Sequence, residues 1–347
     1  MMSRITVPGR TPISLSSRLT FALRAKKGGL TGLVLVLALL SGQAPRPLLA
    51  QTTAAPPDPV VGPARGALLV AGGGELGMEI WDRFVELAGG EDARIVVIPT
   101  AADDRDLPYG WRGFDALQEA GGGQLVLLHT RDPNEANLEA FAVPLQNATG
   151  VWLPGGRPWR LVDAYLHTRV HEELFALLDR GGVVGGTSAG ASIQGSLLMR
   201  GDPKTNRTIF SPEYPEGFGF LEEVAVDQHL LVRERERDLP KVLAVHPRLR
   251  GIGLDKGTAL VVRGDRAEVI GTSQVLVYDG NHPSASPRRF AAGSIFDLES
   301  GQRVRNRGTP SRPSEISAAV RSRQSDAHYR GIGDSWNGAY KLAHSRR

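Results

Sequence analysis

The sequence predicts an α/β fold, in which a mostly parallel sheet is flanked by helices and a few antiparallel strands follow near the C-terminal end of the domain. Short apolar runs that end in small or turn residues alternate with longer runs whose apolar residues recur at helical spacing. Strands and helices that alternate in this way build βαβ units and a parallel sheet. After Gly251 the helical runs stop, and short β-branched runs separated by glycine turns indicate the antiparallel strands.

The N-terminal residues precede this alternation and predict a secretory signal peptide. Basic residues crowd the start, no acidic residue precedes Asp58, and the apolar run 33–40 leads to small residues that end at Ala50. This order of basic, apolar and cleavable segments is typical of a signal peptide. A membrane span needs about 20 apolar residues, so an uncleaved anchor is the weaker alternative. We expect a signal peptide over residues 1–50 and a secreted or periplasmic protein that meets the membrane only during export.

Two further segments are not expected to form a packed core. Residues 51–65 are rich in Pro and Ala, which predicts a linker. Residues 301–347 are rich in Arg, Ser, Asn and Gly and poor in branched apolar residues, which predicts a disordered basic tail. We favour a solvated tail over a nucleic-acid-binding arm, because the protein is expected to be exported. One α/β domain then fills residues 66–300.

The elements of this domain follow in chain order. Strands are expected over 66–74, 93–102, 123–130, 150–156 and 181–188, since each is a short apolar run. Helices are expected over 78–90, 110–122 and 158–182, and each of these runs ends in a glycine pair, which is a helix stop signal. Ligands of such a sheet bind at the carboxyl ends of the strands. The residues that directly follow the strands are therefore the first candidates for function.

The last of these strands leads into the run GTSAG at 186–190, which matches the G-x-S-x-G nucleophile elbow. The motif requires a strand before it and a helix after it, and the helix-compatible stretch 189–199 meets the second condition. Glycines are needed because the turn is sharp and strained. The alternative is a plain tight turn; a Walker A loop is excluded because no lysine follows in register. We favour Ser188 as a nucleophile.

A serine nucleophile needs a base and an oxyanion hole. His229 directly follows a strand-like apolar run, although a lone histidine is more often structural than catalytic. The glycine pair after the run 150–153 ends a strand that should face the elbow. We expect the N–H groups of Gly156 and Ala189 to be the oxyanion donors, with a simple strand end as an equally good alternative for the glycines. Cysteine is absent, which excludes disulfides, thiolate metal sites and a cysteine nucleophile. We expect no metal and no cofactor.

Taken together, GGTSAGA, the downstream DQH, the arginines after it and GIGLD-x-x-TALVV resemble the serine peptidases of the cyanophycinase and dipeptidase E type, peptidase family S51. The resemblance covers roughly residues 66–297. It implies a flavodoxin-like or class I amidotransferase-like fold, with Ser188 as nucleophile and His229 as base. It also implies a peptide or cyanophycin-like substrate. The residues implied to hold an acidic group of that substrate are Asp227, Gln228, Arg233 and Arg235.

The sequence departs from the family at two places. Arg157-Pro158-Trp159 follows the glycine pair where the family usually has Asp-Gln or Arg-Gln, and Lys256 stands where the family has the acidic residue of its triad. We predict that Asp255 is the acidic partner and that Lys256 faces solvent. The alternative partners are Glu213, Glu216 and Glu222.

The residues predict an exported serine hydrolase that works through an acyl-enzyme, and the resemblance implies an exopeptidase that cleaves aspartyl or β-aspartyl-arginine bonds. The alternative, which Lys256 favours, is a non-catalytic binding protein on the same fold that keeps an arginine-lined pocket for acidic ligands. An esterase of the α/β-hydrolase class is disfavoured, because no HGGG-like loop is present. A homodimer is left open, and no nucleic-acid partner is expected.

Overall fold

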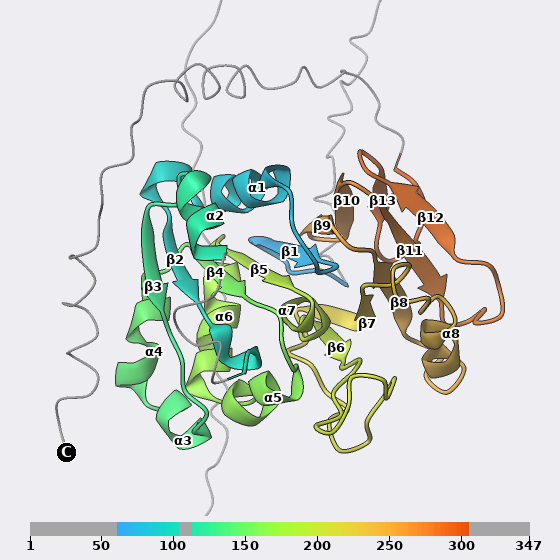
Figure 1. Cartoon of the computed structure of the whole chain (residues 1–347), viewed down its shortest axis with the longest axis horizontal. Helices are drawn as coiled ribbons and strands as arrows, with labels where there is room; N and C mark the ends of the chain where they lie inside the picture. The colour runs from blue at the N-terminus through green and yellow to red at the C-terminus, as the bar shows by residue number, and fades with distance from the viewer. Residues whose placement is uncertain (1–60, 104–112, 305–347) are drawn as a thin grey trace, which may run out of the picture. The chain divides into compact units, whose positions relative to one another are not determined.

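Two β-sheets form the framework of the described residues, 61–103 and 113–304, in a computed structural model (Figure 1). The chain divides into two units, Met1–Ala55 and Pro56–Arg347, and all of these residues belong to the second unit. The predicted signal peptide, residues 51–60 of the predicted linker and residues 305–347 of the predicted tail lie outside the described residues.

The larger sheet has eight strands in the described part of the chain, in the order β13-β10-β9-β1-β5-β4-β2-β3. The five strands from β1 to β3 in this order pair in parallel, and β9, β10 and β13 join them antiparallel. The prediction of a mostly parallel sheet with antiparallel strands near its C-terminal end is therefore confirmed. Its strands are β1 (Ala67–Ala71), β2 (Arg94–Val97), β3 (Gln124–Leu127), β4 (Gly150–Leu153), β5 (Val183–Thr187), β9 (Thr258–Arg263), β10 (Arg266–Gly271) and β13 (Ile295–Asp297).

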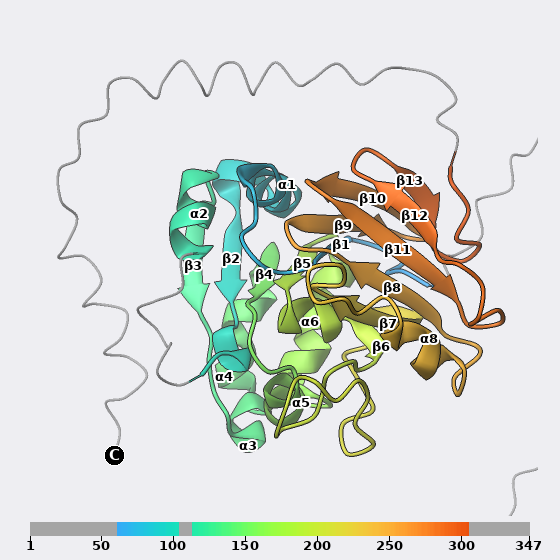
Figure 2. The ribbon, with the colours of Figure 1, turned by 45° about the vertical axis from the view of Figure 1, so that its right-hand side comes forward.

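The smaller sheet was not predicted as a separate unit. It has the order β12-β11-β8-β7-β6, with β6, β7 and β8 parallel to one another. Figure 2 shows it on the side of the larger sheet away from β2 and β3. Its strands are β6 (Gly195–Leu197), β7 (Leu221–Gln228), β8 (Arg250–Leu254), β11 (Gln274–Asp279) and β12 (Arg288–Ala291).

Helices cover both faces of the parallel part of the larger sheet (Figures 1 and 2). The α-helices are α1 (Met78–Ala88), α2 (Gly113–Glu119), α3 (Pro133–Ala136), α4 (Glu139–Gln146), α5 (Trp159–Tyr165), α6 (Arg169–Asp179), α7 (Ala189–Ser192) and α8 (Asp238–Leu243). Two 3₁₀ turns are η1 (Gly90–Asp92) and η2 (Pro99–Ala101). No helix among the described residues has the length and apolar character that a membrane span requires.

Strand β1 shows why the sheet is buried on both faces. Leu68 and Val70 pack into the cluster that contains α4 and α6, whereas Leu69 packs into the cluster that contains α1. Neighbouring residues of a strand point to opposite faces, so a strand covered by helices on both sides is apolar throughout. This explains why the predicted strands are continuous apolar runs rather than alternating ones.

Two predicted helices are shorter than the sequence pattern indicated. The run 158–182 is broken between α5 and α6, where His167 adopts a left-handed φ of 61° and the Thr168 hydroxyl donates to the Tyr165 carbonyl oxygen. The stretch 189–199 forms only the four-residue α7 before Gly195 enters the smaller sheet beside β7. In both places local contacts end the helix although apolar residues continue at helical spacing.

Candidate active site

Ser188 lies at a sharp turn between β5 and α7, as the elbow motif predicts. Its φ of 54° and ψ of −109° are outside the regions that most residues occupy. Gly186 and Gly190 have no room for a side chain, because added Cβ atoms would lie 2.2 Å from the Gly190 carbonyl oxygen and 1.9 Å from that of Leu153. The two glycines of the motif are therefore required by the close approach of backbone to backbone.

The hydroxyl of Ser188 faces the imidazole of His229. Ser188 Oγ lies 3.1 Å from His229 Nε2, within hydrogen-bonding distance. His229 directly follows β7 and also has a left-handed φ, 54°. If the Ser188 hydroxyl donates to Nε2, the ring carries its proton on Nδ1. The structure thus brings together, from two sheets, the two residues that were predicted as nucleophile and base.

A glycine loop after β1 holds the imidazole in this place. The His229 N–H donates to the Gly72 carbonyl oxygen at 2.8 Å. The ring packs against Gly73 so closely that a Cβ there would lie 2.4 Å from Nε2. From the sequence, these glycines are expected only to end a strand. A run of three glycines after a buried strand was the available signal that another group approaches there.

The surroundings of His229 favour the neutral imidazole. Its pKa is lowered to about 4, mainly by burial and then by the positive charges of Arg233 and Arg235, while Asp255 opposes this effect. Lys256 also lowers the pKa, with the smallest contribution of these groups. An uncharged imidazole at neutral pH is the form that can accept a proton from a serine hydroxyl.

Asp255, the predicted acidic partner, does not contact the imidazole directly. One carboxylate oxygen accepts the N–H groups of Leu231 and Val232, both at 3.2 Å, and the other accepts the Ser273 hydroxyl at 2.8 Å. Within residues 61–103 and 113–304, no carboxylate is hydrogen-bonded to the His229 ring. Asp255 thus anchors the turn that follows His229 and acts on the ring through its charge.

The alternative acidic partners and Lys256 are exposed. Glu213, Glu216 and Glu222 all lie on the surface, and Glu216 faces His167 at 3.5 Å. Lys256 is exposed, and its aliphatic chain lies against Gly74, where a Cβ would meet it at 2.2 Å. None of the three glutamates is hydrogen-bonded to His229 in the described structure.

The predicted oxyanion donors lie at or beside the elbow. A Cβ on Gly155 would lie 3.8 Å from Ser188 Oγ, which places the end of β4 next to the hydroxyl. Gly156 has a φ of 145° and packs against the Ala101 carbonyl oxygen, and Ala189 is the first residue of α7. Neither the Gly156 nor the Ala189 N–H has an acceptor in the part of the chain that is described. Both groups are available to a ligand oxygen.

The four predicted substrate-binding residues divide into buried and exposed ones. Asp227 has no exposed surface, and Gln228 and Arg235 are largely buried. Arg235 Nη1 donates to the Gln228 carbonyl oxygen at 3.1 Å and lies 3.7 Å from an oxygen of Asp227. Arg233 is exposed, but its charge acts on His229.

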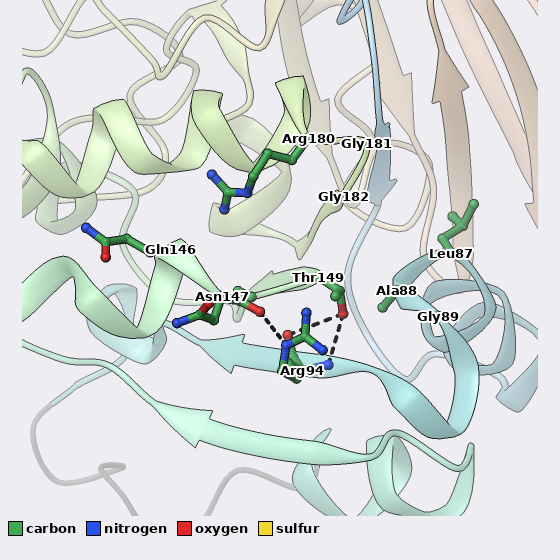
Figure 3. Close-up of a pocket in the computed structure, with 11 residues that line it drawn as sticks. Leu87, Ala88, Gly89, Arg94, Gln146, Asn147, Thr149, Arg180, Gly181 and Gly182 are labelled. Atoms are coloured by element: carbon green, nitrogen blue, oxygen red, sulfur yellow. Dashed lines mark hydrogen bonds between the residues drawn. The ribbon is translucent and has the colours of Figure 1, made fainter.

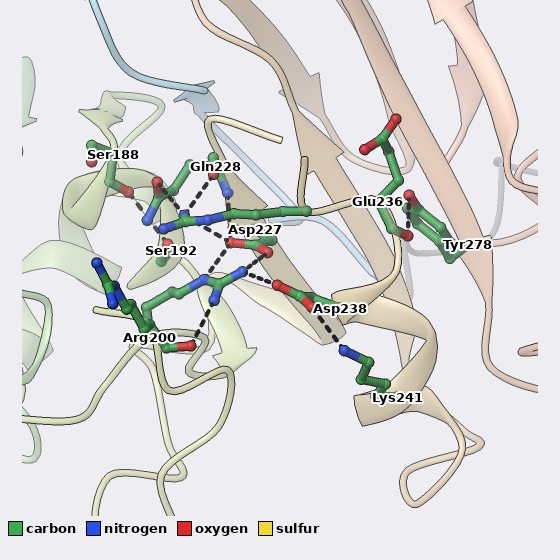
Figure 4. Close-up of polar contacts among 11 residues, drawn as sticks. Ser188, Ser192, Arg200, Asp227, Gln228, Glu236, Asp238, Lys241 and Tyr278 are labelled. Carbon is green, nitrogen blue, oxygen red and sulfur yellow. Dashed lines mark hydrogen bonds and ion pairs between the residues drawn. The ribbon is translucent and has the colours of Figure 1, made fainter. Parts of the chain in front are cut away.

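One central residue of this group, Arg200, was missed. Its guanidinium binds both carboxylate oxygens of Asp227, at 3.1 and 2.7 Å, and also Asp238 at 2.7 Å (Figure 4). Burial alone would lower the pKa of Arg200, but the hydrogen bonds and charges of the two aspartates raise it. The signal available in the sequence was weak, since Arg200 belongs to no motif and its partners are distant along the chain.

Arg157 and Trp159, which depart from the family pattern, follow the carboxyl end of β4. The Arg157 guanidinium donates to the Asp202 carbonyl oxygen, and the backbone N–H of Arg157 donates to the Ala101 carbonyl oxygen. Trp159 is half-buried and lies 6.2 Å from the Tyr214 ring, and its indole N–H has no partner in the described structure.

A cavity of about 420 Å³ lies at the opposite, amino end of the strands (Figure 3). Arg94 and Arg180 line it, but they donate to the carbonyl oxygens of Asn147 and Leu145 at the C-terminal end of α4. Such arginines satisfy the carbonyl groups that a helix end leaves unpaired. The cavity has a structural explanation, and the candidate site is the one around Ser188.

Comparisons with known proteins identify the family of the chain. Residues 68–270 match the sequence profile of peptidase family S51. A cyanophycinase from Geminocystis herdmanii is 34% identical over 224 residues, which cover 62% of this chain and 81% of that protein. One from Trichormus variabilis is 32% identical over 222 residues, which cover 61% and 73%. The chain belongs to peptidase family S51 and is a serine-type peptidase, a hydrolase.

The solved structures add evidence on the fold. The crystal structure of a peptidase from an acI-B1 Actinobacterium matches with a TM-score of 0.51 and 23% identity, over 67% of this chain and 97% of that one. The predicted family and its flavodoxin-like or class I amidotransferase-like fold are confirmed.

The lowered pKa of His229 makes a testable prediction for the pH dependence. If the neutral imidazole is the base, kcat/KM should fall as the pH drops through about 4, because protonation removes the base. An unperturbed histidine would give this fall near 6.5. Because the pKa is lower in the folded state, its contribution to stability is complete above about pH 6.5 and is lost as the pH falls towards 4.

A pH–rate profile and an NMR titration of the His229 ring measure this pKa in two ways. A ring that titrates near 6.5 in both experiments would contradict the effect of burial and of the arginines.

Proposed function

We propose that this S51 peptidase is a cyanophycinase-like serine exopeptidase that hydrolyses aspartyl or β-aspartyl-arginine peptide bonds. The observation that carries the proposal is the 3.1 Å contact between Ser188 Oγ and His229 Nε2 at a strained elbow. Relatives named as cyanophycinases support the substrate class. Arg233 and Arg235 beside the imidazole support an acidic group in the substrate.

In the proposed reaction, Ser188 Oγ attacks the carbonyl carbon of the scissile bond while its proton passes to His229 Nε2. The N–H groups of Gly156 and Ala189 stabilise the oxyanion that forms. The tetrahedral intermediate collapses to an acyl-enzyme, and the leaving amine takes the proton from His229. Water, deprotonated by His229, then releases the acid product and restores the Ser188 hydroxyl. All atoms are accounted for by the peptide and one water molecule.

Asp255 is the acidic group that supports this chemistry. Its carboxylate fixes the turn after His229 through Leu231 and Val232, and its negative charge raises the pKa of the imidazole. A triad carboxylate that hydrogen-bonds the ring directly does more, since it also selects the tautomer. We therefore assign Asp255 a smaller share of the rate than such a carboxylate has.

The alternative of a non-catalytic binding protein rests on Lys256 at the family's acidic position. The exposed position of Lys256 and the intact Ser188–His229 contact weigh against it. The expected export of the protein remains part of the proposal, because residues 1–50 lie outside the described structure.

Ser188→Ala should abolish hydrolysis, with a loss of about 10⁴-fold or more in kcat, since removal of a nucleophile has effects of this size. Turnover of cyanophycin, β-Asp-Arg and Asp-X dipeptides measures it. The control is Ser192→Ala, because the Ser192 hydroxyl donates to the Ser188 carbonyl oxygen and not to His229. Wild-type turnover by the Ser188→Ala protein would refute the elbow as the reacting site.

Asp255→Asn should lower kcat by about 10- to 100-fold, which corresponds to roughly 1.4 to 2.7 kcal/mol of lost electrostatic support. The amide oxygen can still accept the N–H groups of the turn. Lys256→Glu should change kcat less than about tenfold, and upward, because the residue is exposed. A wild-type protein without activity that gains it through Lys256→Glu would instead establish the binding-protein alternative for the natural sequence.

The mature protein should begin at Gln51 and be found outside the cytoplasm. N-terminal sequencing of protein from the native host tests this, since cleavage after Ala50 removes the preceding segment. Recovery of residues 1–30 from the secreted or periplasmic fraction would contradict a cleaved signal peptide.

A further inference from the structure

Arg200 is one of the most deeply buried charged side chains in the described structure, with 2% of its surface exposed. It lies in the loop after β6 and has a left-handed φ of 65°. The guanidinium binds Asp227 with two donors and Asp238 with one, and it also donates to the Arg207 carbonyl oxygen at 3.4 Å. A strained backbone and a bidentate ion pair show that its position is strongly constrained.

Asp227 is shared unequally between two arginines. Arg200 lies at 3.1 and 2.7 Å from its oxygens, whereas Arg235 lies at 3.7 Å, beyond hydrogen-bonding distance. Asp227 also has no exposed surface, so it cannot meet a ligand itself. Asp227 therefore forms its main ion pair with Arg200.

Of the charged side chains around Asp227, all but Arg235 form a balanced set of ion pairs. Arg200 pairs with Asp227 and Asp238, and Lys241 pairs with Asp238 at 3.2 Å (Figure 4). These four side chains carry equal numbers of positive and negative charges. Arg235 is the cation left over beside them.

Arg235 also keeps donors that no protein group uses. The hydrogen bonds of its guanidinium all come from Nη1 and go to the backbone and side-chain oxygens of Gln228. Its Nε and Nη2 have no acceptor among the described residues, yet neither is a buried unsatisfied atom. These two groups form one edge of the guanidinium, the edge that can bind a carboxylate with two parallel hydrogen bonds.

We propose that Arg200 is a positioning residue that sets the affinity for acidic substrates. By occupying both oxygens of Asp227, it prevents Asp227 from neutralising Arg235, which stays free to bind the carboxylate of the substrate. The inference deepens the proposed function and rests on its acidic substrate class. Without Arg200, Arg235 is the nearest remaining cation for the buried Asp227 carboxylate and moves towards it.

A simpler role for Arg200 would be to stabilise the fold by pairing a buried carboxylate. Removal of one partner of a buried ion pair is destabilising, and removal of both is often tolerated. The two roles differ in what happens at Arg235. Only the positioning role predicts a specific loss of affinity for acidic ligands in protein that is still folded.

The test is a double-mutant cycle with Arg200→Met, Asp227→Asn and the combination of both. The probes are N-acetylaspartate and its neutral analogue N-acetylasparagine, with dissociation constants measured by calorimetry. The rate at which a neutral fluorophosphonate labels Ser188 measures the reactivity of the elbow with a probe that carries no carboxylate. Arg237→Met is the control for the loss of one positive charge, because Arg237 is exposed.

Arg200→Met should weaken N-acetylaspartate binding by about tenfold or more, as expected for the loss of a charge-assisted hydrogen bond. Asp227→Asn should not weaken it, and the double variant should bind within about threefold of wild type, because no carboxylate then competes for Arg235. Labelling of Ser188 should stay within about threefold in every variant. Arg237→Met should bind as wild type does.

Unchanged affinity in Arg200→Met, or a double variant as weak as Arg200→Met, would overturn the inference. If Arg200→Met does not fold, Arg200→Lys replaces it in the cycle, since lysine keeps the charge but not the bidentate grip; Arg200→Lys that binds as tightly as wild type would then be the refuting result. A wild-type protein that binds no N-acetylaspartate would refute both the inference and the acidic substrate class. One that binds it but hydrolyses nothing would refute only the proposed hydrolysis.

Discussion

The close approach of the glycine loop 72–74 to His229 is the constraint on which the candidate site depends. Ser188 directly follows a strand of the larger sheet, and His229 directly follows a strand of the smaller one. The loop after β1 joins them, because the Gly72 carbonyl oxygen accepts the His229 N–H and Gly73 leaves the space that the ring fills. A side chain at Gly73 would displace the imidazole from the hydroxyl. The orientation of the imidazole is thus set by contacts with the backbone, where many serine peptidases use a carboxylate on the ring.

Three of the six non-glycine residues with positive φ in the described part of the chain belong to the candidate site or to the ion pairs described with it. Ser188, His229 and Arg200 are non-glycine residues with left-handed φ values of 54°, 54° and 65°. Each such conformation costs of order 1–3 kcal/mol and persists only where the surrounding fold holds it. The buried β-strands on either side provide that support. At Ser188 and His229 the strained backbone accompanies the contact between the hydroxyl and the imidazole, and at Arg200 it accompanies the ion pairs with Asp227 and Asp238.

The sequence predicted the parts of the structure that depend on local pattern. The parallel strands, α1 and the elbow follow from apolar periodicity and from one short motif, and the structure has all of them. The contacts of Arg200 could not be predicted, since its partners lie 27 and 38 residues away and no motif joins them. The smaller sheet was missed because β6 has only three residues and resembles the continuation of a helix. The contacts of Asp255 depend on a turn that begins 24 residues earlier in the chain.

The positive charges near His229 lower its pKa in the free protein, and a carboxylate bound among them would raise it again. Arg233, Arg235 and Lys256 all lower the pKa of His229, so in the proposed reaction they oppose the imidazolium that would form when Ser188 gives up its proton. A carboxylate bound to Arg235 has the opposite effect, because its negative charge stabilises the imidazolium. Under the proposed function, an acidic substrate would therefore supply part of the electrostatic support that a triad carboxylate gives elsewhere. Under the same proposal, a neutral substrate would bind less tightly and would also leave His229 a weaker base, so the same arginines would select substrates both in binding and in catalysis.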